Sequence, residues 1–218
     1  MIFDCDGVLV DSEVLVAGIE AELLGEFGVP MTARDVAEAF VGLSDEDMHR
    51  LIEERWGIEL PAEFALEKVR RVDRSILAEL NPVPGIGAVL ESVRGARCVA
   101  SSSRPEPIHA SLSRTGLARF FEPHVFSASM VARGKPAPDL FLYAADEMGA
   151  RPGHCVVIED SPHGVAAGVS AGMTVIGFTA ASHCRPDLPQ RLLDAGAQTV
   201  VTNSEGLAEA LVSWTGGR

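Results

Sequence analysis

From about residue 96 onward, hydrophobic positions fall into short runs separated by stretches with helical spacing. The runs occupy residues 96–101, 124–128, 154–160, 174–179 and 198–202. Short apolar runs bounded by turn signals are typical of buried strands, and apolar residues repeating every three to four positions are typical of helices. With the opening residues 1–3, this alternation predicts about six strands joined by helical crossovers, which is the pattern of a parallel α/β sheet.

Residues 13–81 break the alternation, because helical spacing dominates there. The clearest repeat has one apolar residue every three or four positions: Ala65, Val69, Val72, Ile76 and Leu80. The prolines and glycine of residues 81–85 mark the end of this stretch. We therefore predict a discontinuous, Rossmann-like α/β core at 1–12 and 82–218, interrupted by an all-helical insert of about four helices at 13–81.

Composition narrows the possible partners and compartment. Hydrophobic residues make up 47% and charged residues 22% of 218 residues, which is ordinary for a globular protein. The formal net charge of −13 argues against nucleic acid. No apolar run approaches the roughly 18 residues of a membrane span, and no secretory signal is visible. Cys5, Cys98, Cys155 and Cys184 are scattered, so we expect reduced thiols in a cytoplasmic protein.

Asp4 and Asp6 are the first candidates for chemistry. Side chains two apart on a strand point the same way, and ligands bind at the carboxyl ends of parallel strands. A simple turn is the alternative, since Asp-Gly is a frequent turn dipeptide. Only residues 1–3 precede Asp4, and three residues are few for a central strand. Whether the native chain begins before Met1 is therefore an open question.

Two later strand ends also carry polar residues. Ser101 ends the run 96–101, and Ser103 with Glu106 has capping-box spacing, which would place hydroxyls and amides at a helix N-terminus that can bind an anion. Glu159 and Asp160 end the run 154–160 just before another helix. Helix capping and the helix dipole are the ordinary explanations for each group alone.

Lys135 lies on a loop before a predicted helix, and alone it would be an ordinary solvated charge. Together with the acids and serines at the other strand ends, Lys135 forms a set of residues that can be explained by a single site. Several carboxylates in one crevice repel one another unless a cation joins them, and oxygen ligands beside phosphate suit Mg²⁺. The combined set therefore predicts a phosphoryl-transfer site.

The ordered motifs resemble those of the haloacid dehalogenase superfamily, phosphatase branch, over nearly the whole chain. "DCDGV" at residues 4–8 matches the D-x-D-G-[VT] signature, Ser101 matches the serine of the second motif, and Lys135 in "GKPAPDLF" matches the motif lysine. "EDSPHG" at residues 159–164 matches the acidic motif. The position of the helical insert is similar to the family's type-one cap.

This resemblance implies a Mg²⁺-dependent phosphatase. Asp4 would be the nucleophile that forms an aspartyl-phosphate, and Asp6 would be the general acid and then the general base. The metal ligands would be Asp4, the backbone carbonyl of Asp6, and Asp160, with Glu159 binding directly or through a neighbour. Because the dehalogenases lack an acid at the position of Asp6 and the phosphonatases usually carry alanine there, both activities are disfavoured.

The resemblance also implies the substrate class, a small phosphorylated metabolite such as a sugar phosphate or a phosphorylated sugar acid like 6-phosphogluconate. Ser101, the Ser102 amide and Lys135 would bind its phosphoryl oxygens. The cap loop would set specificity through four residues: Gly42, Leu43, Ser44 and Asp45. Nothing implies an obligate protein partner.

Two alternatives stay open at this point. β-Phosphoglucomutase-type transfer shares every core motif, but Asp45 stands where that enzyme has an arginine, and Val16 stands where it has a histidine. Both differences favour hydrolysis. A signalling domain that keeps phosphate on an aspartate is the other alternative, although phospho-receiver domains are about half this length and need no cap.

Overall fold

The computed structural model describes residues 1–40 and 45–216, and the chain divides into two compact units. The α/β unit comprises Met1–Asp11 and Asn81–Arg218, and the helical unit comprises Ser12–Leu80. The boundaries expected from the sequence lie one residue farther along the chain at both points. Gly42, Leu43 and Ser44, predicted to set specificity, lie outside the described residues, as does the side chain of Asp45.

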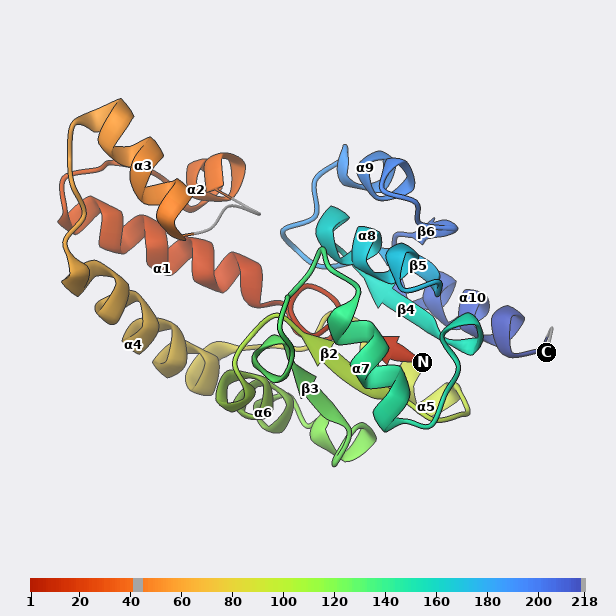
Figure 1. Ribbon diagram of the computed structural model, residues 1–218. Helices are drawn as coiled ribbons and strands as arrows, with labels where there is room; N and C mark the ends of the chain where they lie inside the picture. The colour runs from red at the N-terminus through yellow and green to blue at the C-terminus, as the bar shows by residue number, and fades with distance from the viewer. Residues whose placement is uncertain (41–44, 217–218) are drawn as a thin grey trace. The chain divides into compact units, whose positions relative to one another are not determined.

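A six-stranded parallel sheet forms the centre of the α/β unit, with the order β3-β2-β1-β4-β5-β6 (Figure 1). Each strand lies within one of the apolar runs described above, so the predicted Rossmann-like α/β fold is confirmed. The strands are β1 Ile2–Phe3, β2 Cys98–Ser101, β3 Val125–Ser127, β4 Val156–Glu159, β5 Thr174–Phe178 and β6 Thr199–Val201.

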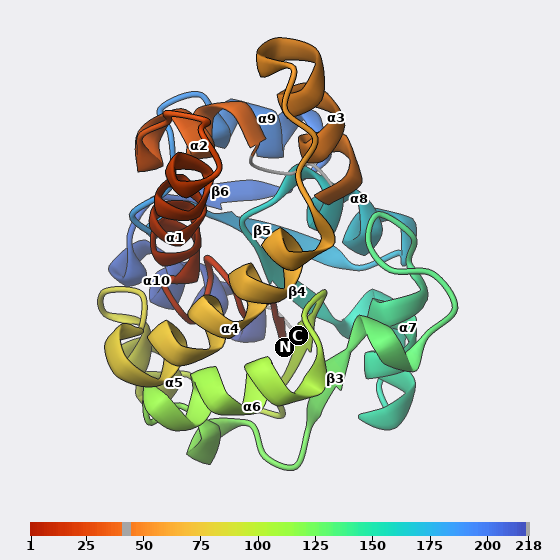
Figure 2. The same cartoon turned by 90° about the vertical axis from the view of Figure 1, so that its left-hand side faces the viewer.

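Helices cover both faces of this sheet (Figures 1 and 2). The first face carries α7 Asp139–Glu147, α8 Pro162–Ser170 and α9 Leu188–Asp194. The second carries α5 Ile86–Ser92, α6 Pro105–Arg114 and α10 Ser204–Gly216. Double coverage explains why the central strands are continuously apolar instead of alternating. Short 3₁₀ turns occupy Ala118–Phe120, Ala128–Met130 and Pro152–His154.

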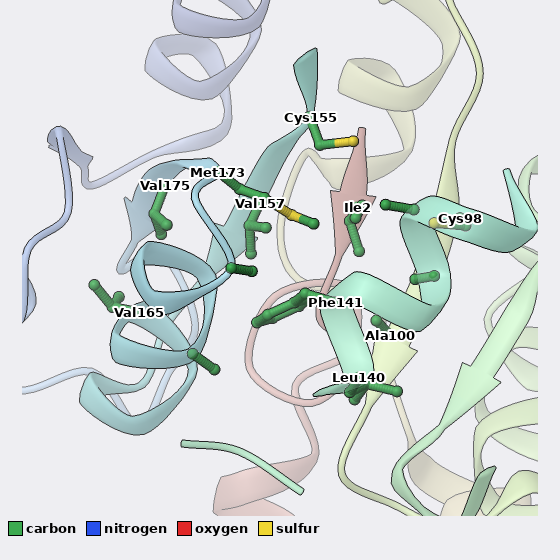
Figure 3. Close-up of a cluster of buried hydrophobic side chains, with 14 of the residues drawn as sticks. Ile2, Cys98, Ala100, Leu140, Phe141, Cys155, Val157, Val165, Met173 and Val175 are labelled. Carbon is green, nitrogen blue, oxygen red and sulfur yellow. The ribbon is translucent and has the colours of Figure 1, made fainter. Parts of the chain in front are cut away.

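The apolar core on the first face holds the sheet against α7 and α8 (Figure 3). Ile2, Val157 and Val175 contribute from three strands, and Phe141 and Val165 contribute from the two helices. Burying a side chain of this size contributes about 1.5–3 kcal/mol. The apolar packing therefore stabilises β1 and β4, whose carboxyl ends carry the candidate site.

Three glycines in and after α8, spaced by four residues, have different functions in the structure. A Cβ at Gly168 would lie 2.7 Å from Cγ2 of Val175, so the helix packs closely on the sheet at this residue. Gly172 instead ends the helix with a φ of +72° and has open space around it. Gly164 packs against a polar side chain of the candidate site, described below.

The helical unit, considered by itself, contains α1 Ser12–Glu26, α2 Ala33–Phe40, α3 Asp45–Trp56 and α4 Ala62–Glu79 (Figure 2). Its core includes four fully buried side chains: Leu23, Leu24, Ile52 and Phe64. Within the described residues, no helix combines the length and apolar character needed to cross a bilayer.

Ion pairs connect α1 and α4 inside the helical unit. Lys68 Nζ lies 2.6 Å from Glu20 Oε1, and Arg71 Nη1 lies 2.8 Å from Glu26 Oε1. Arg71 also bonds Glu67 one turn earlier on α4. These contacts fix the two long helices to each other.

The two segments that lead out of and back into the α/β unit run side by side. Val10 forms an antiparallel bridge with Pro82, and Val83 N donates to the Leu9 carbonyl at 3.0 Å. Asp11 N donates to the Asn81 carbonyl at the same distance. The helical unit is thus inserted at a single place in the fold.

Candidate active site

Asp4 lies directly after β1, and its amide donates to the Ile158 carbonyl of β4 at 3.0 Å. A tight loop follows, in which Val10 N donates to the Cys5 carbonyl and Gly7 adopts a φ of +76°. The segment is therefore a turn, as one interpretation of the sequence held. It also presents Asp4 and Asp6 at the carboxyl edge of the sheet, as the other interpretation held.

Lys135 joins two of the predicted site carboxylates. Its Nζ lies 2.8 Å from Asp4 Oδ1 and 2.6 Å from Glu159 Oε1, and it donates to the Ala100 carbonyl at 3.1 Å. The three charged side chains are only 5%, 11% and 0% exposed, in the order Lys135, Asp4, Glu159. Residues far apart in sequence are thus brought together at the carboxyl ends of β1, β2 and β4.

Burial and charge act in opposite directions on this group. Burial raises the pKa of Asp4 well above its usual range, and the neighbouring Lys135 opposes that rise. Burial alone would lower the pKa of Lys135, but Asp4 and Glu159 outweigh it and raise the pKa of the lysine. The lysine therefore stays protonated at neutral pH and can bind an anionic substrate.

Both oxygens of Glu159 have hydrogen-bond partners. Oε1 bonds Lys135, and Oε2 accepts from Ser161 N at 3.1 Å and from Ser161 Oγ at 2.9 Å. Ser161 Oγ in turn accepts from Gly164 N and caps α8. A Cβ at Gly164 would lie 1.8 Å from Glu159 Oε1. The glycine of the acidic motif is thus required by the Glu159 side chain and not by close packing on the sheet.

Asp160 is held by a histidine that the sequence analysis missed. His183 Nε2 lies 3.2 Å from Asp160 Oδ2, and both side chains are largely buried. Burial alone would lower the pKa of His183, but the hydrogen bond with Asp160 outweighs it and the pKa is raised to about 10. A lone histidine after a strand carries no motif, so only the fold reveals this contact.

Asp4, Glu159 and Asp160 form a compact acidic cluster. Each can place one carboxylate oxygen within 4.8 Å of the others, and all three residues are buried. With Lys135 and His183 they make a group in which three acids face two basic side chains, and like charges this close are unfavourable without a further cation. Hard oxygen donors suit Mg²⁺ or a similar divalent ion. The residues present therefore fit the expected metal.

Asp6 is oriented by two serines at the end of β2 and just after it. Ser103 Oγ donates to Asp6 Oδ2 at 2.8 Å, and Ser101 Oγ donates to the same oxygen over a longer 3.4 Å. Ser101 is fully buried, and its hydroxyl accepts from Ser103 N at 3.0 Å. Ser102 lies between them and is exposed. Ser101, which was predicted to bind phosphate, thus lies beside the carboxylate predicted to move the proton.

The expected capping box of Ser103 and Glu106 is wrong. The residue at the N-cap of α6 is Arg104, without a side-chain capping bond, and Pro105 begins the helix. The Ser103 hydroxyl is instead used by Asp6. Local spacing could not reveal this use of the hydroxyl, because the acceptor on Asp6 lies 97 residues earlier in the chain.

A Rossmann-like sheet with an inserted helical unit and a buried carboxylate–lysine group at its carboxyl edge is typical of phosphate-ester hydrolases. A family model described as haloacid dehalogenase-like hydrolase matches residues 1–172. The chain belongs to this family. The prediction of an enzyme from its phosphatase branch is confirmed by this match together with the relatives below.

Several characterised relatives cover most of the chain. It is 31% identical over 186 residues to a 6-phosphogluconate phosphatase of Escherichia coli, covering 84% of each chain. It is 33% identical to a fructose-1-phosphate phosphatase of the same organism, covering 81% of this chain and 94% of that one. A β-phosphoglucomutase of Bacillus subtilis is 30% identical, with 81% of each chain covered.

A solved structure supports the fold over its full length. A haloacid dehalogenase-like protein of unknown function from Agrobacterium tumefaciens superposes with a TM-score of 0.91 at 36% identity. The match covers 98% of this chain and 97% of that one.

Proposed function

We propose that this protein is a Mg²⁺-dependent phosphomonoesterase that acts through an aspartyl-phosphate on Asp4. The observation that carries the proposal is the buried contact of Lys135 with both Asp4 and Glu159. A lysine beside a candidate nucleophile neutralises negative charge where a phosphoryl group would sit. An ion pair kept only for stability would have no need of three clustered acids.

Asp4 and Asp6 divide the reaction between them. A carboxylate oxygen of Asp4 attacks phosphorus, and the bond from phosphorus to the leaving oxygen breaks while Asp6 gives that oxygen its proton. Asp6 then takes a proton from water, whose oxygen attacks phosphorus and releases inorganic phosphate and the free Asp4 carboxylate. The bond from Ser103 to one oxygen of Asp6 supports this assignment, because it orients the carboxyl group.

The cation would be held by Asp4, the backbone carbonyl of Asp6, and Asp160. When bound, it supplies positive charge that stabilises the phosphoryl oxygens during transfer. We assign Glu159 to orienting Lys135, because its own oxygens are already bonded to Lys135 and Ser161.

The remaining groups bind the phosphoryl oxygens. Lys135 supplies the charge, and the Ser101 hydroxyl and the Ser102 amide supply hydrogen-bond donors after β2. The substrate we propose is a small phosphorylated sugar or sugar acid, because the relatives named above act on such compounds. The helical unit acts as a cap that selects it and excludes water.

The direct test is release of inorganic phosphate from 6-phosphogluconate, fructose 1-phosphate and glucose 6-phosphate, with MgCl₂ or with EDTA. We expect release only with Mg²⁺, and Asp4→Asn should reduce it by at least about 10⁴-fold. Asp187→Asn is the matched control, because Asp187 is a half-exposed acid paired with Arg185 on the same unit. Equal release by Asp4→Asn and wild type would reject the nucleophile.

The proton-transfer assignment has its own test. The leaving group of p-nitrophenyl phosphate needs no proton, so Asp6→Asn should still be phosphorylated by it but should stall for lack of a base. Mass spectrometry of the quenched protein is expected to find phosphate on the peptide that contains Asp4. If Asp6→Asn turns over p-nitrophenyl phosphate as fast as wild type, Asp6 is not the base.

Phosphoryl transfer of the β-phosphoglucomutase type is the second candidate, favoured by similarity to the Bacillus subtilis enzyme. β-Glucose 1-phosphate would then become glucose 6-phosphate without net phosphate release, which ³¹P NMR distinguishes. Val16 in α1 weighs against this candidate, because an apolar side chain at that position cannot carry a proton.

A further inference from the structure

His183 is a buried side chain that the proposed mechanism does not yet use. It lies in residues 179–184, the segment that directly follows β5 at the carboxyl edge of the sheet. Nε2 is 3.2 Å from Asp160 Oδ2, and the two side chains are 9% and 7% exposed. Cys184 Sγ lies 3.8 Å from the same nitrogen, a longer and weaker contact. Asp160 is therefore the strong partner of the ring.

The backbone around His183 is fixed within the α/β unit. Ser182 N donates to Asp11 Oδ1 at 3.1 Å, and Ser182 Oγ donates to the other oxygen of Asp11. Cys184 N donates to the Ala181 carbonyl at 3.1 Å and closes a turn. These bonds hold the chain on both sides of His183, so the ring is already in place before any ligand binds.

Gly7 leaves the space that the pair of side chains occupies. A Cβ at residue 7 would lie 1.8 Å from Asp160 Oδ2 and 2.9 Å from His183 Cε1. The aspartate and the histidine thus pack against the backbone that directly follows Asp6. The glycine of the first motif is required by this contact as well as by its positive φ.

The ring is not placed there for stability alone. His183 Nδ1 is buried and has no hydrogen-bond partner among the described residues. A buried nitrogen without a hydrogen-bond partner costs stability. A buried polar group retained at a cost is typical of a functional site.

We infer that His183 is a positioning residue that fixes the Asp160 carboxylate for the divalent cation, an inference that rests on the proposed function. A carboxylate has two oxygens, and a hydrogen bond to one of them sets the plane in which the other can coordinate. Loss of such a partner typically weakens metal affinity by about 10–100-fold. Ser161 orients the Glu159 carboxylate in a comparable way, and His183 does so for Asp160.

The test measures Mg²⁺ binding to the metal-free protein by isothermal titration calorimetry, without substrate. His183→Ala should raise the Kd for Mg²⁺ by about 10–100-fold. His183→Gln should recover most of that affinity, because its amide nitrogen can donate to Asp160. Ser182→Ala is the matched control, since it removes only the hydroxyl bond to Asp11, keeps the backbone bond that holds the segment and leaves His183 and Asp160 intact. Its Kd should stay within about twofold of wild type.

Each result decides between the possibilities. If His183→Ala binds Mg²⁺ like wild type, if Ser182→Ala loses as much affinity, or if wild type binds no Mg²⁺, the inference is overturned. Should His183→Ala fail to fold, His183→Phe keeps the ring volume without the donor and should show the same loss. A wild type that binds Mg²⁺ through His183 yet releases no phosphate rejects the proposed function and leaves this inference intact.

Discussion

The two units of the molecule use charged side chains in opposite ways. In the helical unit, Lys68 bonds Glu20 and Arg71 bonds Glu26 across two helices, and the two basic side chains are 17% and 25% exposed. In the α/β unit, Lys135 is shared by two buried acids and a third acid lies beside them. The first arrangement holds helices together. The second concentrates charge that the fold alone does not need.

The difference between the two units indicates which charged residues are functional and which are structural. Buried charges stabilise a fold poorly, because their desolvation offsets most of their attraction. A cluster with surplus negative charge therefore indicates a missing positive partner, whereas a matched pair indicates a structural link. The four predictions below test that contrast, beginning with the largest effect.

The largest contrast is expected between two lysine-to-methionine substitutions. Lys135→Met leaves Asp4 and Glu159 buried without their shared cation, which should cost about 3–5 kcal/mol of unfolding free energy. Lys68→Met removes a matched, less buried pair and should cost about 1–2 kcal/mol. Urea unfolding in EDTA measures both. Equal losses would break the distinction between the two units.

Mg²⁺ should stabilise the wild-type protein through the α/β unit. At 100 times its Kd, a ligand that binds only the folded state adds about 2.7 kcal/mol. Asp160→Asn should abolish this gain in thermal unfolding. Glu20→Gln, which alters a buried acid of the helical unit, should retain it. A gain that survives Asp160→Asn would locate the ion elsewhere.

Two glycine-to-alanine substitutions in helices should have opposite signs. Gly164→Ala in α8 places a Cβ 1.8 Å from Glu159 Oε1, and such overpacking should destabilise by about 1–3 kcal/mol. Gly25→Ala in α1 meets open space and should stabilise by up to about 1 kcal/mol. Thermal melts of the two variants give the comparison. A stable Gly164→Ala would mean that Glu159 can move freely.

The smallest effect concerns thiol labelling, since all four cysteines lie in the α/β unit. Burial raises the pKa of Cys5 well above its ordinary value and raises that of Cys98 to about 12, so little reactive thiolate forms at pH 8. The half-buried Cys184 should react with a disulfide reagent first. Leu24→Ala in the helical unit should leave the slow labelling of Cys5 and Cys98 unchanged. Faster labelling there would show that the two units unfold together.

The sequence predicted those parts of the fold that depend on local pattern. Apolar runs located all six strands, because strands covered on both faces must be apolar throughout. Asp4, Lys135 and Asp160 could be singled out because each follows a strand or precedes a helix in a recognisable motif. Their expected proximity follows from the parallel sheet, whose carboxyl ends share one edge.

The contacts that escaped prediction connect residues far apart in sequence. Ser103 was assigned to a helix cap, since nothing local reveals that Asp6 competes for its hydroxyl. His183 carries no motif, and its importance depends on the path of residues 179–184 after β5. The bonds between Asp11 and Ser182 depend on the same path. Spacing arguments cannot reach such pairs, because loop geometry decides them.

The side-by-side pairing of Leu9–Asp11 with Asn81–Val83 has a consequence for how this chain can be engineered. Asp11 N and the Asn81 carbonyl are hydrogen-bonded, so the insert begins and ends at two adjacent antiparallel segments. A two-residue hairpin turn is enough to join strands so arranged. The insert is therefore an exchangeable module. We expect that it can be cut out, or replaced by a different one, without changing the register of the sheet that carries the acids.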